Sequence, residues 1–265
     1  MCRDFVDFNR VNLQHYIWKD IFGYSLHPKI PRDGKSLKIA YVGTGTGIWL
    51  LDLAPQLDES AELFGLDVDV TQAGPKEWLP NNFSLRKWGV FAEVPDDLVA
   101  PFDIVHLRFF AFVIEDDPTP VVGNLIKLLK PGGYIQWGDI DAQSMQLLTS
   151  LPDIPADKLA ALWKATIPID SRVFPGWCRD LAQIFQSHGL QEVEADWQIG
   201  KRQSSMAMHW CNLSVHEMIG GRLRLKNPQR ASEIAALVQA AAVQTQKGAM
   251  FMYDRVNVLG RKPKA

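Results

Sequence analysis

The sequence predicts an α/β protein whose strands form a doubly wound, mostly parallel sheet. Short apolar runs alternate with amphipathic segments along the first half of the chain, as in strands joined by crossover helices. Runs such as "FDIVHL" are apolar almost throughout, which is typical of strands covered on both faces. A glycine-rich turn, "GTGTG", directly follows the first of these runs, where sheets of this class place their ligand sites.

The strands and helices are assigned in chain order from these patterns. Residues 5–22 are predicted to form an amphipathic helix before the first strand, because their apolar side chains recur at three- and four-residue spacings. Strands are expected at 37–42, 63–67, 83–88, 102–107, from about Tyr134, at 191–197 and at 250–259. Helices are expected at 46–56, 118–130, 155–166, 177–188, 204–219 and 228–246, with a short helical turn at 75–80.

The chain shows no internal repeat and no low-complexity linker, so a single main domain is expected. Residues 1–36 are predicted to form an N-terminal lid helix and loop. Residues 37–265 are predicted to form the main domain, with a helical cap inserted around 200–247. This organisation gives a seven-stranded sheet with a lid on one side and a helical insertion late in the chain.

Composition and charge argue against several kinds of partner and structural site. Lysine and arginine number 28 against 30 aspartate and glutamate, a net charge of −2, which gives no reason to expect nucleic acid or a membrane surface as partner. The three cysteines form no CxxC pair, which argues against a disulfide framework and a zinc site. No apolar run is long enough for a transmembrane helix, and the N-terminus lacks the apolar core of a signal peptide. A cytoplasmic enzyme is expected.

The glycine turn predicts a ligand that contains adenosine. A strand, a tight turn and a helix N-terminus present backbone N–H groups to a ligand. The dinucleotide fingerprint would need a glycine where Ile48 stands, and the turn lacks the Gly-Lys-Ser/Thr ending of a nucleotide phosphate loop. Asp67 ends the second strand about 20 residues after the turn, where a carboxylate can accept from two ribose hydroxyls.

Five segments carry a resemblance to a known family: "NLQHYIWKDIFGYSLHP", "VGTGTGIWLLDLA", "FGLDVD", "FDIVHLRFF" and "DDPTPVVGNLIKLLKPGGYIQW". With them the chain resembles the S-adenosylmethionine (SAM)-dependent methyltransferases of fungal secondary metabolism, over nearly its whole length. The resemblance implies the class I methyltransferase fold, which is Rossmann-like, and SAM as cofactor.

The resemblance also implies roles for individual residues. The glycine turn would approach the methionine and ribose parts of SAM, Asp67 would bind the ribose hydroxyls, and residues 88–90 would flank the adenine. His106 and Arg108 would face the transferred methyl group and the substrate, with the N-terminal helix as a lid. The full set implied for the cofactor is Tyr41, Gly43, Thr44, Gly45, Gly47, Asp67, Val68, Trp88, Gly89, Val90 and His106.

The sequence departs from the family pattern at three positions where a carboxylate is usual. Tyr41 stands before Val42, Gly89 interrupts "KWGVF", and Gly138 interrupts "QWGD". Each lost carboxylate removes a charge-assisted hydrogen bond of about 1.5–3 kcal/mol. Either the remaining groups still bind SAM, or the fold now serves another reaction.

Four residues are candidates for chemistry. His106 is the candidate general base, because histidine titrates near neutral pH and this one ends a central strand; the alternative is a packed core histidine. Arg108 is expected to orient a substrate carboxylate or enolate, or to form a salt bridge with Asp103 or Glu115. Asp139 follows strand five and could reach the substrate, or serve as a cap.

His209 is the fourth candidate, and it shares a helix face with His216, from which it would line the substrate cavity. Two histidines do not make a metal site, so no metal is expected. The tryptophans suit a small, largely apolar or aromatic substrate. A homodimer is kept open as a further partner.

The favoured function is SAM-dependent methylation of a small secondary metabolite, on oxygen. The first alternative is a methyltransferase-fold enzyme that does not methylate, such as a pericyclase or cyclase of a natural-product pathway. The second alternative is a SAM-binding regulator of secondary metabolism.

Overall fold

The computed structural model describes residues 5–167 and 175–264. Its centre is a seven-stranded sheet with the order β3-β2-β1-β4-β5-β7-β6, in which β1 to β5 are parallel and β7 is antiparallel to both of its neighbours. The strands are β1 (Lys38–Val42), β2 (Glu62–Asp67), β3 (Phe83–Lys87), β4 (Phe102–Arg108), β5 (Leu129–Thr149), β6 (Gln191–Gln198) and β7 (Ala249–Arg261). The predicted α/β class and its mostly parallel sheet are confirmed.

Crossover helices cover the two faces of this sheet. They are α2 (Ile48–Leu53), α3 (Thr119–Leu128) and α5 (Leu181–Ser187), and α1 (Phe5–Phe22) precedes the first strand. Tyr41 of β1 lies beside His106 of β4, and Val42 beside Leu66 of β2, so the carboxyl ends of these strands meet at one edge. Parallel strands place ligand sites at that edge.

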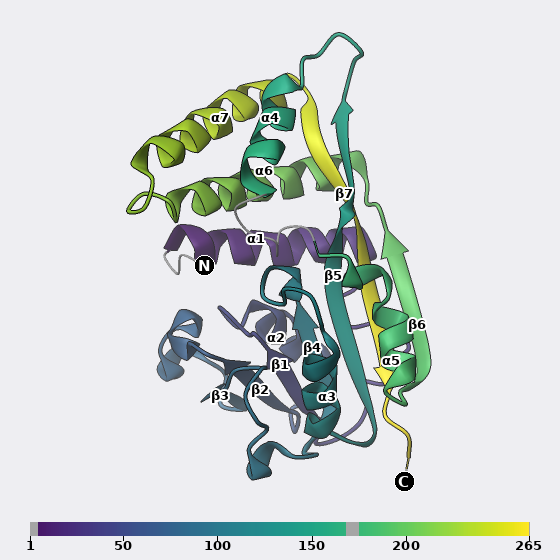
Figure 1. Ribbon diagram of the computed structural model, residues 1–265. Helices are drawn as coiled ribbons and strands as arrows, with labels where there is room; N and C mark the ends of the chain where they lie inside the picture. The colour runs from purple at the N-terminus through teal and green to yellow at the C-terminus, as the bar shows by residue number, and fades with distance from the viewer. Residues whose placement is uncertain (1–4, 168–174, 265) are drawn as a thin grey trace.

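The fifth strand is much longer than the sequence predicts. We expected it from about Tyr134, but β5 begins at Leu129 and runs 21 residues to Thr149. Its far end pairs with the start of β7, where Thr149 lies opposite Ala249. Antiparallel pairing satisfies the backbone of both strands beyond the parallel part of the sheet. Figure 1 shows this long pair reaching the helices at the top of the molecule.

Three helices form a cap around that end of the pair: α4 (Asp157–Thr166), α6 (Arg202–Gly221) and α7 (Pro228–Gln246). They share an apolar cluster with β7 that includes Leu159, Leu213, Ile234 and Phe251. The cap therefore includes α4, which lies outside the 200–247 segment expected from the sequence. Helix α1 passes between α6 and the sheet (Figure 1). Residues 1–4 of the predicted lid segment lie outside the described residues.

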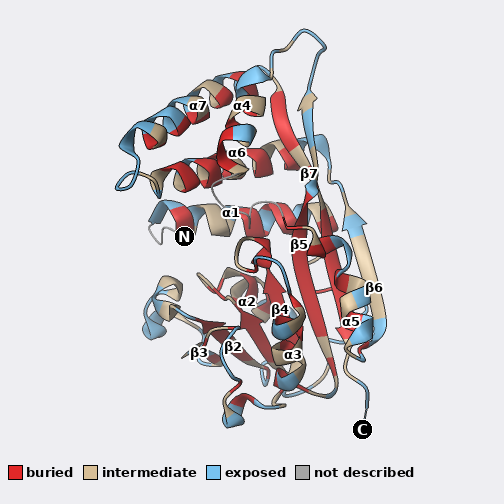
Figure 2. Ribbon diagram, in the orientation of Figure 1, coloured by how far each residue is buried: buried red, intermediate tan, exposed pale blue. Residues whose placement is uncertain are grey.

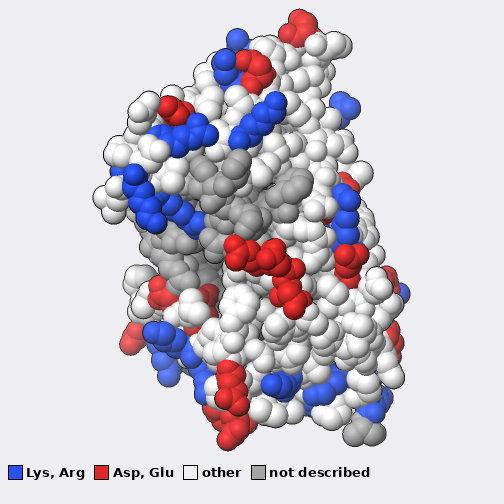
Figure 3. Space-filling model, viewed as in Figure 1, with Lys and Arg blue, Asp and Glu red and all other residues white. Residues whose placement is uncertain are grey.

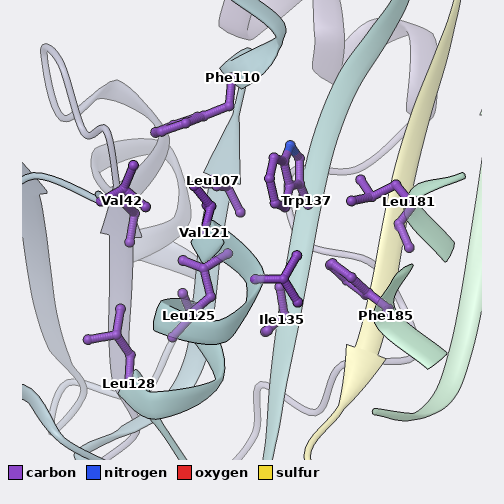
Figure 4. Close-up of a cluster of buried hydrophobic side chains, with 14 of the residues drawn as sticks. Val42, Leu107, Phe110, Val121, Leu125, Leu128, Ile135, Trp137, Leu181 and Phe185 are labelled. Atoms are coloured by element: carbon purple, nitrogen blue, oxygen red, sulfur yellow. The ribbon is translucent and has the colours of Figure 1, made fainter. Parts of the chain in front are cut away.

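The main core lies between the sheet and helices α3 and α5. Trp137 and Ile135 of β5 face Leu181 and Phe185 of α5, and Leu125 comes from α3 (Figure 4). The central strands are buried along most of their length, and exposed residues are concentrated on the outer faces of the helices (Figure 2). This burial on both faces explains the almost continuous apolar runs of the central strands.

Charged side chains of both signs are interspersed on the face seen in Figure 3, with wide uncharged areas between them. Within the described residues, no helix combines the length and the apolar character needed to cross a membrane.

Candidate active site

A cavity of about 440 Å³ opens at the carboxyl ends of β1 to β4 and extends beneath α1 and α6. We call its two parts the strand-edge half and the cap half. The strand-edge half is lined by Tyr41, Val42, Gly43, Gly45, Asp67, Val68, Trp88, Gly89, Val90, Phe91 and Ala92. The cap half is lined by Met208, Asn212, Val215, Met218, Ile219, Arg222, Tyr253 and Arg255. The volume falls in the range usual for small-molecule sites.

The glycine turn is held in a conformation that favours glycine. Gly43, Gly45 and Gly47 all have φ between +53° and +76°, the left-handed region. A Cβ atom on Gly43 would also lie 2.7 Å from the Phe110 ring. Two amides of the turn, those of Gly43 and Thr44, donate to the Leu66 carbonyl of β2 at 2.8 and 3.1 Å. The turn is therefore fixed to the neighbouring strand, as an approach to a ligand by the backbone requires.

Asp67 ends β2 beside this turn. Its carboxylate accepts hydrogen bonds from the Gly45 amide at 2.9 Å and from the Asp69 amide at 3.1 Å. The side chain also lines the cavity, although only 7% of the residue is exposed. Backbone donors fix the orientation of this carboxylate, which therefore presents a preorganised acceptor to hydroxyl groups in the strand-edge half.

The segment after β3 closes the outer side of the strand-edge half. Trp88 is nearly buried, and its indole donates to the Glu93 carbonyl at 3.1 Å. A Cβ atom on Gly89 would lie 2.9 Å from the Val68 side chain. Packing against Val68 thus favours glycine at position 89, and the glycine leaves its backbone open to a flat ligand beside Val90.

Not every residue expected at the cofactor lines the cavity. Thr44 and Gly47 do not, although both shape the turn. Gly47 is the N-cap of α2, and Thr44 is buried against Gly65 of β2. These two residues contribute through the backbone conformation of the turn.

Tyr41 and Arg108 lie together at the base of the cavity. Burial raises the pKa of the Tyr41 phenol, so it stays protonated beside the Arg108 guanidinium. Arg108 contacts His15 of α1 through a nitrogen pair at 3.1 Å, and the ring of Trp18 lies 5.6 Å from its guanidinium carbon. Burial lowers the pKa of His15 to about 4, so the ring is neutral and accepts from Arg108. Arg108 therefore joins the lid helix to the strand edge.

The expected role of Asp139 in catalysis is not supported by its position. The residue is fully buried and does not line the cavity. Its carboxylate accepts from the amides of Phe110 and Ala111 and from the Trp137 indole, at 2.8 to 3.1 Å. Those bonds hold the loop after β4, in which Phe109 has a φ of 62°. Asp139 is a positioning residue for this loop, whose aromatic side chains line the cavity.

His106 also lies away from the cavity, contrary to the expectation of a general base. It is 1% exposed, and its ring stacks on Trp49 of α2 with centroids 4.0 Å apart. Burial, together with Arg108, holds the pKa of His106 well below its usual range. His106 lies two residues before Arg108 on β4, beside Tyr41 of β1. The alternative of a packed core histidine describes its environment.

His209 points into the cap core rather than into the cavity. Its two ring nitrogens contact the Thr245 hydroxyl at 2.8 Å and the Phe251 amide at 3.1 Å. The cavity is lined by the neighbouring face of α6, at Met208 and Asn212. Successive residues of an α-helix are rotated by about 100° around its axis, so Met208 and His209 lie on different faces of α6. The described residues contain no cluster of three or more potential metal ligands.

Sequence analysis missed Tyr253 and Arg255, which reach the cavity from β7. Both are buried, and because they are two positions apart their side chains lie on the same face of the strand. The available signal was the charged pair Asp254 and Arg255 within the mostly apolar run "FMYDRVNVLG". The alternative expected for Arg108, a salt bridge with Asp103, is not formed, because Asp103 pairs with Lys130 at 2.6 Å.

Comparisons with known proteins agree with this geometry. Residues 27–195 match the family model described as a methyltransferase domain. The chain is 35% identical over 141 residues to methyltransferase grgD of Penicillium sp, covering 51% of this chain and 50% of that protein. It is 34% identical over 131 residues to N-methyltransferase tcpN of Claviceps purpurea, covering 48% and 47%. The chain thus spans about half the length of these curated relatives.

Solved structures share the fold at low sequence identity. Phosphoethanolamine N-methyltransferase 2 of Haemonchus contortus matches with a TM-score of 0.56 and 14% identity, covering 99% of this chain and 60% of that one. The [4+2]-cyclase SpnF matches with a TM-score of 0.53 and 14% identity, covering 97% and 95%. These likenesses concern the fold alone. With its matched domain and its seven-stranded sheet, the chain belongs to the class I methyltransferase family.

Proposed function

We propose that the protein transfers a methyl group from SAM to an oxygen atom of a small, largely apolar metabolite. The observation that supports this most directly is one continuous cavity with two differently built halves. The strand-edge half combines the glycine turn with the fixed Asp67 carboxylate. The cap half is mostly apolar, and the two halves together offer room for a cofactor and an acceptor in one cavity.

The residues of the strand-edge half fit an adenosylated cofactor. Gly43 and Gly89 stand where a side chain would contact Phe110 or Val68, and both positions border the cavity. Asp67 offers an oriented acceptor for ribose hydroxyls, and the segment at 88–90 offers an apolar face for a base. Tyr41 replaces the carboxylate usual in the family and keeps a protonated hydroxyl beside Arg108. The fit therefore rests on the backbone of the glycine turn and on the single carboxylate of Asp67.

When bound, SAM supplies an electrophilic methyl group, and positioning dominates such a transfer. The chain contributes the enclosure: α1 and α6 cover the cavity, and the aromatic loop after β4 lines it. None of the described residues that line the cavity is a histidine. An acidic hydroxyl or carboxyl group beside an arginine loses its proton to solvent before the transfer, because the guanidinium lowers its pKa, so an acceptor oxygen of this kind needs no histidine base. This favours oxygen as the acceptor atom.

Calorimetric titration with SAM and S-adenosylhomocysteine tests the cofactor site. We expect micromolar binding that Asp67→Asn weakens about ten- to hundredfold, since a charge-assisted bond is lost. Asp96→Asn removes an exposed carboxylate outside the cavity and should leave the affinity unchanged. Absence of binding by the wild-type protein at millimolar cofactor would refute the proposal. Mass and NMR analysis of methylated products then identifies the acceptor atom.

A second candidate is a non-methylating cyclase on the same fold. The observation that favours it is the loss of carboxylates at Tyr41 and Gly89, both of which border the cavity. Such an enzyme would convert a reactive apolar substrate within the same enclosure. Turnover that continues after removal of SAM and S-adenosylhomocysteine would support this candidate over methyl transfer.

A further inference from the structure

Two buried arginines, Arg108 and Arg255, line the same cavity. They are 5% and 1% exposed, and they come from β4 and β7, on either side of β5. Two further arginines line the cavity: Arg10 of α1, which is paired with Asp7, and Arg222, which follows the last residue of α6. Within the described residues, neither Arg108 nor Arg255 forms a salt bridge with a carboxylate. Burying a cation without a counter-ion is costly, so a site that does so is suited to an anionic ligand.

The two arginines lie on one face of the sheet. Arg108 is in register with Gly138 of β5, which is in register with Asn257 of β7. Arg255 is two residues from Asn257, so its side chain points to the same face. Neighbouring strands lie about 4.8 Å apart, which places β4 and β7 about 10 Å apart. An anionic group on a flat ligand can therefore lie between the two strands or beside either of them.

Arg108 and Arg255 are compensated in different ways, and each has a buried Nε atom without a hydrogen-bond partner among the described residues. Arg108 has the Trp18 and Phe109 rings within 5.6 and 5.3 Å of its guanidinium carbon, and it also contacts His15. The Nη1 atom of Arg255 donates only to the carbonyls of Ile199 and Tyr253, at 3.0 and 2.9 Å. Its buried Nε atom has no hydrogen-bond partner among the described residues. The Arg255 guanidinium is thus held in place by two carbonyl groups and still has an N–H group available to donate to a ligand.

The neighbouring Tyr253 supplies a second donor. It is buried, lines the cavity and projects from the same face of β7 as Arg255. Burial raises the pKa of its phenol, so the hydroxyl remains protonated and able to donate. Burial lowers the pKa of Arg255 only to about 10, so the guanidinium remains charged at neutral pH. Both groups border apolar side chains of α6.

We propose that Arg255 and Tyr253 form an anion-binding subsite in the cap half, which takes the carboxylate of an otherwise apolar, aromatic acceptor. The identification of this ligand as the acceptor rests on the proposed function. The subsite itself requires only that the cavity bind an apolar anion better than its neutral counterpart. A second source of carboxylate is the methionine part of the cofactor, and the experiment separates the two.

Fluorescence titration with two matched probes tests the subsite on the full chain. The anionic probe is 8-anilinonaphthalene-1-sulfonate, and N-phenyl-1-naphthylamine presents the same rings without the charge. Both are titrated with and without saturating S-adenosylhomocysteine. We expect the anionic probe to bind at least tenfold more tightly than the neutral one. Arg255→Met should remove that preference while changing the affinity for the neutral probe less than twofold.

Three further variants make the test decisive. Arg255→Lys keeps the charge and should retain part of the preference, and Tyr253→Phe should reduce it a few-fold. Arg224→Met removes an exposed arginine that does not line the cavity and should have no effect. If Arg255→Met does not fold, as shown by circular dichroism, then the wild-type preference and the Tyr253→Phe variant decide the question.

The outcomes separate this proposal from the proposed function. Equal wild-type affinities for the two probes, or a preference that survives in folded Arg255→Met, overturn the subsite. A preference abolished by S-adenosylhomocysteine, with weaker binding of that ligand to Arg255→Met, overturns it too, because the anion would then be the cofactor's own carboxylate. If the wild-type protein binds no S-adenosylhomocysteine but prefers the anionic probe, the subsite stands and the methyl-transfer proposal fails.

Discussion

The strand-edge half of the cavity is formed by backbone turns, whereas the cap half is formed by side chains from segments far apart in the chain. In the strand-edge half, the glycine turn and Asp67 are joined by hydrogen bonds between neighbouring strands. In the cap half, α6 and β7 meet around a separate apolar cluster. The first arrangement depends on backbone geometry, whereas the second depends on side chains, most of which lie on α6 and can be exchanged without disturbing the pairing of the strands.

The largest expected effect is in the glycine turn. Gly43→Ala forces a left-handed φ of 69° on alanine and places a Cβ atom 2.7 Å from the Phe110 ring. We expect the affinity for S-adenosylhomocysteine to fall at least a hundredfold and the free energy of unfolding to fall by about 2–4 kcal/mol. Gly189→Ala is the matched control, because Gly189 has a φ of 79° but open space around it. It should lose only about 1 kcal/mol, and an equal loss at both sites would contradict the role of the close contact.

The next effect should be confined to the cap. Leu213→Ala opens a space in the apolar cluster shared by α4, α6 and α7, and should cost about 2–5 kcal/mol. Calorimetry should show cofactor affinity within twofold of wild type, measured at a temperature where the variant is folded. Leu225→Ala removes a side chain that is 99% exposed and should change neither quantity. Loss of cofactor binding in Leu213→Ala would show that the two halves are not independent.

Lowering the pH should move the two regions in opposite directions. In the cap, burial lowers the pKa of His209 to about 3 and of His216 to about 4, so the unfolded cap binds more protons below about pH 6.5. Each histidine then contributes stability that is lost as the pH falls from 7.5 to 5.5, about 1–1.5 kcal/mol. Burial raises the pKa of Asp139 to about 7, so the loop after β4 gains stability over the same interval.

Native-state hydrogen exchange at pH 7.5 and 5.5, with rates normalised for intrinsic exchange, measures this difference. Amides of α6 and α7 should lose protection at pH 5.5, and those of residues 109–113 should keep or gain it. A uniform change across both regions would contradict the assignment of the buried groups.

The smallest effect is expected at His106. His106→Phe keeps an aromatic ring against Trp49 and alters no side chain that lines the cavity. Cofactor affinity and turnover should therefore stay within twofold of wild type. Its neighbour in register, Tyr41, lines the cavity, and Tyr41→Phe should weaken cofactor binding a few-fold. A loss of turnover in His106→Phe with unchanged binding would restore histidine as the base.

Prediction from sequence succeeded where the signal was local. The parallel strands were placed within a residue or two, because each is a short apolar run bounded by polar turns. It failed at β5, whose last residues alternate weakly and form a strand only because β7 pairs with them. Prediction also failed for His209. The periodicity of α6 shows which residues share a helix face, but not whether that face packs against the cap core or lines the cavity.

The sequence by itself determined the class of sheet, the glycine turn and the acidic residue after the second strand, since these depend on contacts between residues near in sequence or on adjacent parallel strands. Only the tertiary structure decided which charged groups share the cavity. It places His106, Asp139 and His209 in packed or hydrogen-bonded positions, and it brings Arg255 from the last strand to the cap half of the cavity. The physical reason is that a side chain's chemistry depends on its burial and partners, which long-range packing sets.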